Sequence, residues 1–150
     1  MIDVSRKAKV LREATAEGMI YLKPETVKRV QEGKTVKGDP LYTAKIAAIL
    51  AAKKTSELIP LCHPLPLTNV EVCSEVLEDT SAIKVFVTVK TCAQTGVEME
   101  ALTAVSAALL TIWDMTKQYE KNSEGQYPTT AIQNIHVIRK YKQKANNSYE

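Results

Sequence analysis

The most distinctive segment of the chain is an apolar stretch over residues 96–117, GVEMEALTAVSAALLTIWDMTK, with charged residues at both of its ends. Glu98 and Glu100 lie near its start, and Asp114 and Lys117 lie near its end. Ionisable groups are costly to bury unless they are paired or take part in chemistry. Asp114 and Lys117 stand one helical turn apart among apolar neighbours, which favours an acid–base pair in a partly dry site. The alternative is an ordinary exposed ion pair, which is common and weak.

A proline-rich loop, Glu57–Thr68 or ELIPLCHPLPLT, holds Cys62 and His63 between two of its three prolines. Proline excludes regular helix and restricts the residue before it, so the sequence predicts a stiff loop. A histidine can transfer protons near neutral pH and can donate to phosphate oxygens when it is charged. A structural histidine with a satisfied hydrogen bond is equally compatible with the pattern. Cys62 by itself is more typical of a small apolar side chain than of a nucleophile.

Two groups of basic residues could bind an anion. Lys37 stands just before the start of a predicted helix, where free backbone N–H groups favour negative charge. The end of the last predicted strand carries a second group: Arg139, Lys140, Lys142 and Lys144. Solvated side chains are the ordinary explanation for both groups. Arg12 carries no signal by itself, and His136 is interpreted as a structural residue.

The sequence contains no pattern of metal ligands. Its three cysteines, Cys62, Cys73 and Cys92, include no C-x-x-C pair, and their spacing does not match a zinc site. We therefore expect no metal centre and no cofactor. An odd cysteine count without such a pair also favours reduced thiols in a cytoplasmic protein over a disulfide framework.

Composition excludes several broad classes of protein. The chain has 150 residues, 45% of them apolar and 25% charged, which suits one globular domain over residues 1–150. Its net charge of +3 does not indicate a nucleic-acid-binding protein. No apolar run reaches the roughly 20 residues of a membrane span. The N-terminal segment MIDVSRKAKV lacks the apolar centre of a secretion signal.

The elements that must position these residues follow an informative order. Residues 1–16 are mixed and charged, and we expect them to be extended. Periodicity and turn residues then predict strands over 17–22, 70–77, 83–90 and 132–139, and helices over 23–31, 40–54 and about 96–119. Asp39 and Pro40 are typical of a helix start. The order β-α-α-β-β-α-β, without its extra helix, predicts an α+β fold: an antiparallel four-stranded sheet with helices on one face.

The long predicted helix also constrains where a site can form. Glu100 and Asp114 lie near one face but 14 residues apart, which is about 21 Å along a straight helix. No small-molecule site easily spans that length within one helix. Two antiparallel copies would bring the Glu100 end of one to the Asp114 end of the other, and Thr103, Ala104 and Ala107 are small enough for close approach. We therefore expect an antiparallel dimer with sites shared between subunits.

Three of these segments resemble one known family. The loop LCHPLPLT, the tripeptide KGD at 37–39 and the segment TGVEMEALTAVSAALLTIWDMTK are similar to the molybdenum cofactor biosynthesis protein MoaC family, the cyclic pyranopterin monophosphate synthases. The resemblance extends from about Val4 to about Lys140. It implies a ferredoxin-like α+β fold with an extra helix. It also implies a homohexamer, a trimer of dimers, with active sites at the dimer interface.

The same resemblance implies an activity and a set of site residues. The reaction would convert a GTP-derived small molecule, 3′,8-cyclo-7,8-dihydroguanosine 5′-triphosphate, into cyclic pyranopterin monophosphate with loss of pyrophosphate, which would make the protein a lyase. Asp114 would be the acid–base residue, Lys117 its essential partner and Lys37 the second catalytic lysine. The substrate would contact Leu61, Cys62, His63, Glu98, Met99, Glu100, Arg12 and Lys140, the last two facing the triphosphate.

The end of the chain departs from the family's pattern. The sequence KYKQKANNSYE stands where many relatives carry a glycine- and serine-rich SGGKSG motif. Lys142 is therefore an alternative to Lys140 as the basic residue that contacts the substrate. The residues also leave open whether a divalent ion assists the release of pyrophosphate.

Two other classes of function compete with the enzyme interpretation. A ferredoxin-like module that binds a small ligand without turnover would share the fold but would not need Asp114 and Lys117. An RNA-binding α+β domain would need exposed aromatic residues on its sheet. The single Phe of the chain, without an aromatic-rich strand, argues against RNA binding.

Overall fold

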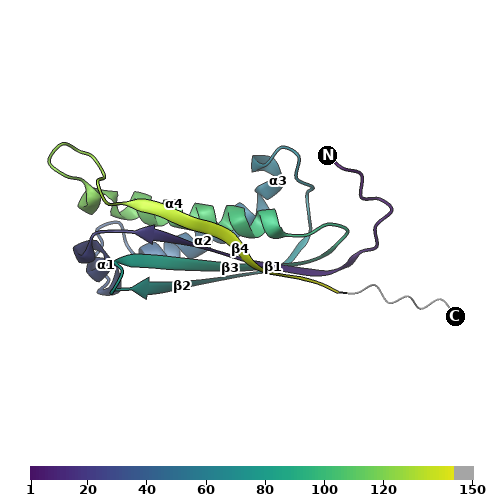
Figure 1. The fold of residues 1–150 in the computed structure, drawn as a ribbon, viewed down its shortest axis with the longest axis horizontal. Coiled ribbons are helices and arrows are strands. Elements are labelled where there is room, and N and C mark those ends of the chain that lie inside the picture. Colours follow the sequence, from purple (N-terminus) through teal and green to yellow (C-terminus); the bar gives the residue numbers. More distant parts are fainter. Residues whose placement is uncertain (144–150) are drawn as a thin grey trace.

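The computed structural model describes residues 1–143, which form four strands and four helices in the order β-α-α-α-β-β-α-β. The strands are β1 (Val10–Tyr21), β2 (Leu67–Leu77), β3 (Ala82–Ala93) and β4 (Ala131–Lys142). The helices are α1 (Pro24–Gln31), α2 (Pro40–Lys53), α3 (Thr55–Leu58) and α4 (Glu98–Glu120). Figure 1 shows an elongated arrangement in which α4 runs along the sheet.

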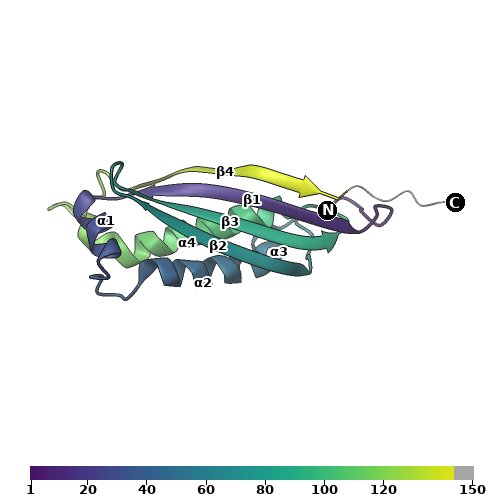
Figure 2. The same ribbon diagram turned by 90° about the horizontal axis from the view of Figure 1, so that it is seen from below.

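The four strands form one antiparallel sheet in the order β2-β3-β1-β4. The first strand of the chain therefore lies between the third and the fourth, as in ferredoxin-like folds. α2 and α4 cover one face of the sheet, and Figure 2 shows the opposite face in front of them. The predicted α+β fold, a four-stranded antiparallel sheet with helices on one face, is confirmed.

The core lies between the sheet and the two long helices. Every second residue in the middle of β3 is buried, because successive side chains of a strand point to opposite faces. The buried set consists of Val85, Val87 and Val89. Leu109 and Ile112 of α4 belong to the same apolar cluster. This packing fixes α4 on the sheet.

Gly18 of β1 allows α4 to approach the sheet closely. A Cβ atom at this position would lie 2.8 Å from the side chain of Leu109 and 2.9 Å from those of Val105 and Ile135. Carbon atoms do not pack at such distances, so a larger residue here would force these side chains to move. The strand residue is therefore small because the helix lies directly against it.

The structure corrects several predicted boundaries, and β2 and β3 are longer than the predicted strands at 70–77 and 83–90. β1 begins at Val10 instead of residue 17, because its inward residues include small alanines that give little hydrophobic signal. A short helix, α3, overlaps the start of the predicted proline-rich loop. β4 continues to Lys142, which pairs with Arg12 of β1, instead of ending at residue 139. Residues 144–150 of the predicted polar tail lie outside the described residues.

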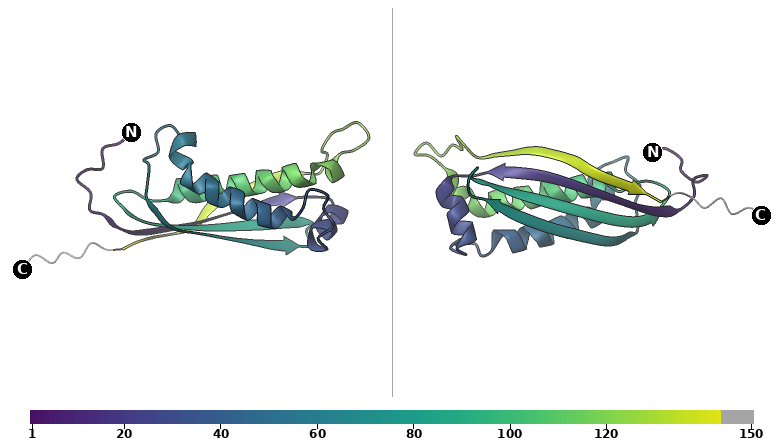
Figure 3. Two further views of the ribbon diagram at one scale, coloured as in Figure 1. Left: turned by 180° about the vertical axis from the view of Figure 1, so that it is seen from behind. Right: turned by 60° about the horizontal axis from the view of Figure 1, so that its bottom comes forward.

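α4 connects the two ends of the molecule. Its 23 residues correspond to a length of about 34 Å. The N-terminus of the chain and α3 lie at the end where α4 begins, and α1 lies at the end where α4 finishes (Figure 3). The first and the last turns of α4 therefore lie near different parts of the chain.

Candidate functional site

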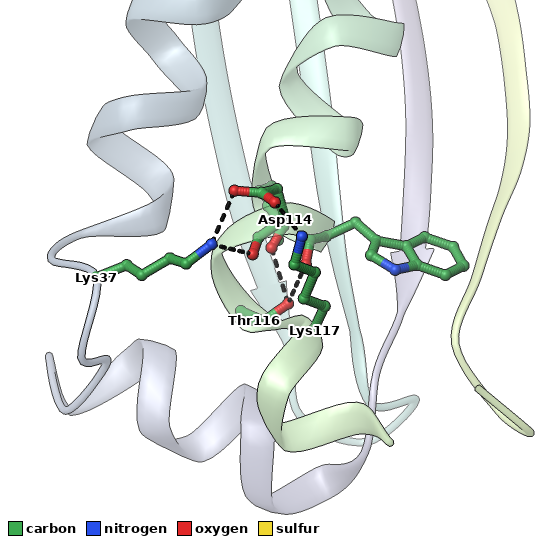
Figure 4. A network of polar contacts seen from close by, with 6 residues as sticks. Lys37, Asp114, Thr116 and Lys117 are labelled. Atoms are coloured by element: carbon green, nitrogen blue, oxygen red, sulfur yellow. Dashed lines mark hydrogen bonds and ion pairs between the residues drawn. The ribbon is translucent and has the colours of Figure 1, made fainter. Parts of the chain in front are cut away.

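Three predicted catalytic residues meet near the C-terminal end of α4, and we call them the lysine–aspartate cluster: Lys37, Asp114 and Lys117. The ammonium group of Lys117 lies 2.6 Å from Oδ1 of Asp114, and that of Lys37 lies 2.9 Å from Oδ2. Lys37 also donates to the backbone carbonyl of Asp114 at 2.9 Å. Figure 4 shows the two lysines approaching one carboxylate from different elements.

The helix and a tight connection set the geometry of this cluster. Asp114 and Lys117 lie one turn apart on α4, so their spacing follows from helix geometry. Lys37 comes from the connection between α1 and α2, where the following Gly38 has a φ of +94°, a left-handed conformation that favours glycine. Asp39 then caps α2 by accepting hydrogen bonds from two backbone N–H groups.

The cap changes the predicted role of Lys37. The sequence places this lysine beside free N–H groups at a helix start, which would form an anion site. The carboxylate of Asp39 already accepts from the N–H groups of the first turn of α2. The Lys37 side chain extends to Asp114 of α4 instead. The prediction of Asp39 as a helix cap is thus confirmed, and the two N–H groups that it binds are not free to hold an anion in this structure.

The two lysines hold Asp114 in its ionised form. The hydrogen bonds from Lys117 and Lys37 lower the pKa of Asp114 to about 2. The hydrogen bond to Asp114 raises the pKa of Lys117. At neutral pH Asp114 is therefore an ionised carboxylate and Lys117 a charged ammonium, the protonation states of a base and an acid. The same two bonds make Asp114 a weaker base and Lys117 a weaker acid than each would be alone.

The cluster is exposed to solvent in the single chain. The side chain of Asp114 is 57% exposed, and that of Lys117 is 44% exposed. The expectation of a partly dry site is therefore wrong for one chain alone. Successive helical residues point about 100° apart, so an apolar neighbour in the sequence does not necessarily cover Asp114. Met115 is buried and does not cover the carboxylate.

An apolar hollow of about 390 Å³ adjoins the cluster. It is lined by Leu110, Trp113, Asp114, Lys117 and Ile132. The Trp113 ring makes an edge-on contact with Tyr127, with ring centroids 5.6 Å apart. Leu110 is 61% exposed although it is apolar. Sequence reasoning missed Leu110 and Ile132 because an apolar residue on a helix or strand normally indicates core.

The predicted substrate-binding residues gather at the other end of α4, in a pocket of about 390 Å³ that we call the loop pocket. Six of them line it: Leu61, Cys62, His63, Glu98, Met99 and Glu100. The first three belong to the proline-rich loop before β2, and the other three belong to the first turn of α4. Two motifs that are distant in the sequence thus form one pocket.

The ionisable groups of the loop pocket differ in their preferred charge. Burial raises the pKa of Glu100, which is only 4% exposed, and the charge of Glu98 raises it further. Burial opposes the ionisation of Glu98 too, but the hydrogen bond from Lys140, at 2.8 Å, contributes to a net lowering of its pKa. Burial and the charge of Glu100 raise the pKa of Cys62. This thiol is therefore a poor nucleophile.

The N-terminal segment of the chain covers the loop pocket. His63 donates through Nε2 to the carbonyl oxygen of Ile2 at 2.9 Å, so its hydrogen bond is satisfied although its ring lines the pocket. Val4 and Lys7 also line the pocket. Sequence reasoning missed these N-terminal residues because the segment has no periodicity that would connect it with a site. The remaining lining residues are Leu65, Thr95 and Gly96.

Arg12 lies beside the loop pocket but binds backbone groups. Its Nε donates to the carbonyl oxygen of Ala93 at 3.0 Å, and one terminal nitrogen donates to that of Gln94 at 2.8 Å. These bonds hold the connection between β3 and α4. The Arg12 charge also contributes to the lowered pKa of Glu98. The predicted contact between Arg12 and a triphosphate stays a prediction.

The basic end of β4 approaches the same pocket. Lys140 forms an ion pair with Glu98 at 2.8 Å, whereas Lys142 pairs in register with Arg12 and is exposed. Lys144, the last member of the predicted basic group, lies outside the described residues. Lys140 therefore contacts a carboxylate of the loop pocket, and which of the two lysines contacts a substrate stays a prediction.

Two negative findings apply to residues 1–143. In that part of the chain no three His, Cys, Asp or Glu side chains are grouped so that they could hold a metal ion. None of its helices has the length and apolar character needed to cross a membrane. His136, interpreted from the sequence as structural, lies on β4 and donates through Nδ1 to the carbonyl of Asn134 at 2.8 Å.

The lysine–aspartate cluster and the loop pocket lie at opposite ends of α4. Fourteen residues separate Glu100 from Asp114 on one continuous helix, or about 21 Å. One chain therefore holds the lysine–aspartate cluster and the loop pocket without bringing them into contact. The fold and the two groups together define a ferredoxin-like α+β protein with a divided candidate active site.

The chain belongs to the MoaC family, whose sequence model matches residues 1–143. A protein of Sulfolobus acidocaldarius described as a probable cyclic pyranopterin monophosphate synthase is 56% identical over 142 residues, which cover 95% of this chain and 98% of that protein. A protein of Thermococcus onnurineus with the same description is 54% identical, covering 96% and 91% of the two chains. A Methanothermobacter thermautotrophicus protein, described as a probable cyclic pyranopterin monophosphate synthase accessory protein, is 56% identical, covering 95% and 88%.

Proposed function

We propose that this protein is a cyclic pyranopterin monophosphate synthase. It would convert 3′,8-cyclo-7,8-dihydroguanosine 5′-triphosphate into cyclic pyranopterin monophosphate and pyrophosphate, as a lyase of molybdenum cofactor biosynthesis. Family membership and the descriptions of relatives that share more than half of its residues support the proposal. The structural observation that carries it is the Asp114 carboxylate, which is bound by one lysine on each oxygen.

The lysine–aspartate cluster suits a reaction with repeated proton transfers. A purine-derived ring must be opened and rebuilt as a pterin, and each step moves protons between ring atoms. The ionised Asp114 would accept a proton, and Lys117 would return one. The two ammonium groups would also stabilise negative charge that develops in the transition state. Asp114, Lys117 and Lys37 are thus assigned to catalysis.

The loop pocket suits the binding of a nucleotide-derived ring and its phosphates. The carboxylates of Glu98 and Glu100 can accept hydrogen bonds from the N–H groups of a purine-derived ring. Lys140, which already forms an ion pair with Glu98, can contribute positive charge to a triphosphate. The charge of Arg12 contributes to the lowered pKa of Glu98, and this residue would add positive charge near the triphosphate. Holding the triphosphate near the ring would favour the internal displacement that releases pyrophosphate.

The two parts of the site need a second copy of the chain. They lie at opposite ends of α4, and an antiparallel dimer would place the Asp114 end of one copy beside the Glu100 end of the other. A partner seated there would also cover the exposed Asp114 and Leu110. We propose a homohexamer, built as a trimer of such dimers, in the cytoplasm. The three free cysteines are compatible with that reducing compartment.

A turnover experiment tests the proposed function. Purified protein is incubated with the cyclised GTP intermediate, and the cyclic phosphate product and pyrophosphate are measured together. We expect the two products in equal amounts, because the displacement that forms the cyclic ester at the α-phosphate breaks the bond to pyrophosphate in the same step. Folded protein that binds the intermediate without forming either product would instead support a ligand-binding module without turnover.

A further inference from the structure

The side chain of Tyr119 connects α4 with the segment that carries Lys37. Its hydroxyl oxygen accepts a hydrogen bond from the backbone N–H of Val36 at 2.9 Å. The guanidinium carbon of Arg29 lies 5.1 Å from the centre of the same ring, a cation–π contact that holds the ring against α1. Tyr119 thus stands two residues beyond Lys117 on α4 and binds the residue directly before Lys37.

Few other contacts hold this connection against α4. Within residues 1–143, the segment between α1 and α2 donates three hydrogen bonds to α4, one from Val36 and two from Lys37 itself. Its remaining hydrogen bonds are internal or join it to α1 or α2, such as the bond from the Lys34 N–H to the Arg29 carbonyl at 2.8 Å and the Asp39 cap of α2. The bond to Tyr119 is therefore the one hydrogen bond that a backbone group of the described connection donates to α4.

A long lysine side chain loses conformational freedom when it is held against one acceptor. That cost falls if the backbone beside it is already fixed at the right distance. Val36 is highly exposed and has no packing of its own to fix it. The hydrogen bond to the hydroxyl of Tyr119 fixes the backbone of Val36, the residue before Lys37.

We propose that Tyr119 is a positioning residue of the lysine–aspartate cluster: its hydroxyl fixes the backbone beside Lys37 so that this lysine reaches Asp114. Tyr119 acts through Lys37 and does not itself contact the carboxylate. The inference rests on the proposed function, because it assumes that Lys37 takes part in turnover. It assigns a catalytic consequence to a residue outside the cluster.

The first test removes only the hydroxyl group. Tyr119→Phe keeps the ring and its contact with Arg29. Tyr21→Phe is the matched control, because the Tyr21 hydroxyl contacts only the Met19 sulfur in the described part of the chain. We expect Tyr119→Phe to increase backbone hydrogen exchange in the segment 33–39, measured by mass spectrometry. We expect kcat to fall roughly three- to tenfold, with KM changed less, and the Tyr21→Phe control to match the wild type in both measurements.

The second test asks whether Tyr119 acts through Lys37. In the Lys37→Ala background, Tyr119→Phe should cause no further loss of kcat, because the lysine that it positions is absent. An equal loss with and without Lys37 would contradict the proposal and indicate a purely structural role. Unchanged exchange and unchanged kcat in Tyr119→Phe would overturn it as well.

The two measurements separate this inference from the proposed function. Full turnover by Lys37→Ala would show that Lys37 is not needed for catalysis. Tyr119 would then have no effect on catalysis through Lys37. Increased exchange in Tyr119→Phe would still confirm the connection between Tyr119 and Val36 in that case. Reduced turnover by Lys37→Ala, together with wild-type exchange and turnover in Tyr119→Phe, would defeat the inference alone.

Discussion

Each oxygen of the Asp114 carboxylate is bound by one lysine, Lys117 on Oδ1 and Lys37 on Oδ2. These bonds, and not burial, determine how tightly Asp114 binds a proton, because they lower its pKa to about 2 while the side chain stays exposed. A ligand with phosphate groups would compete for the same ammonium groups. Loss of either lysine bond would raise the pKa of Asp114 and make it a better proton acceptor.

Replacement of Asp114 by asparagine tests its role as a proton acceptor. Asp114→Asn keeps the size of the side chain and removes its negative charge, so we expect kcat to fall about 10²- to 10⁴-fold. Binding of the intermediate, measured by calorimetry, should be retained. Asp79→Asn, in the turn between β2 and β3, is the matched control and should behave as the wild type. Near-normal turnover by Asp114→Asn would remove this residue from the mechanism.

Glu100 should reduce stability in proportion to its ionisation. Its pKa is raised by burial, so the folded state binds the proton more tightly than the unfolded state does. The tighter proton binding of the folded state therefore stabilises the protein below the unfolded pKa of 4.5. This stabilisation is lost as the pH rises through the folded pKa of Glu100. Glu100→Gln should therefore raise the thermal midpoint at pH 8 and leave it nearly unchanged at pH 4.

Thermal unfolding of Glu100→Gln and of the wild type across this pH range checks the sign. Glu71→Gln, an exposed residue of β2, is the control and should show no such pH-dependent difference. A gain in stability at pH 4 that disappears at pH 8 would contradict the raised pKa of Glu100.

At the scale of elements, the contact between β1 and α4 sets where the helix lies. Gly18→Ala would place a Cβ atom within 2.9 Å of the Leu109 and Val105 side chains. We expect the free energy of unfolding to fall by about 1–3 kcal/mol, the usual cost of an overpacked core. Chemical denaturation measures it, with the exposed Glu71→Ala as control. Equal stability of Gly18→Ala and the wild type would mean that α4 can move away from the sheet at little cost.

The sequence predicted the elements that carry strong local signals. The start of α2 at Pro40 follows from its cap, and α4 follows from a long apolar period. The first half of β1 was missed because Ala14 and Ala16 are buried without being strongly hydrophobic. α3 was missed because four residues next to a proline-rich segment provide too few turns for a periodic signal. The predicted boundaries were therefore wrong where tertiary packing, and not the periodicity of the sequence, determines the secondary structure.

The candidate site was predictable in its residues but not in its surroundings. Motif resemblance named Lys37, Asp114 and His63, and the fold brings each of them to one of the two groups on α4. The exposure of Asp114 could not be inferred, because it depends on which face of α4 meets the sheet. The N-terminal cover of the pocket, including Lys7, depends on a tertiary contact that leaves no pattern in the sequence.

At the scale of the whole molecule, α4 separates the proposed catalytic residues from the proposed binding pocket. The lysine–aspartate cluster and the loop pocket lie near its two ends, about 21 Å apart if measured from Asp114 to Glu100. A single chain would leave the catalytic carboxylate in water and far from the pocket. The central claim is therefore that two copies of the chain complete each active site.

Mixing two inactive variants tests that claim most directly. Asp114→Asn and His63→Ala are co-expressed, and turnover of the mixed oligomer is compared with that of each variant alone. If sites are shared, a mixed dimer has one site with both substitutions and one with neither, so random assortment predicts about a quarter of wild-type turnover. A mixture of Asp114→Asn with Lys117→Ala is the control and should stay inactive, because both substitutions affect the same end of α4. An Asp114→Asn and His63→Ala mixture as inactive as its parents would contradict the shared site.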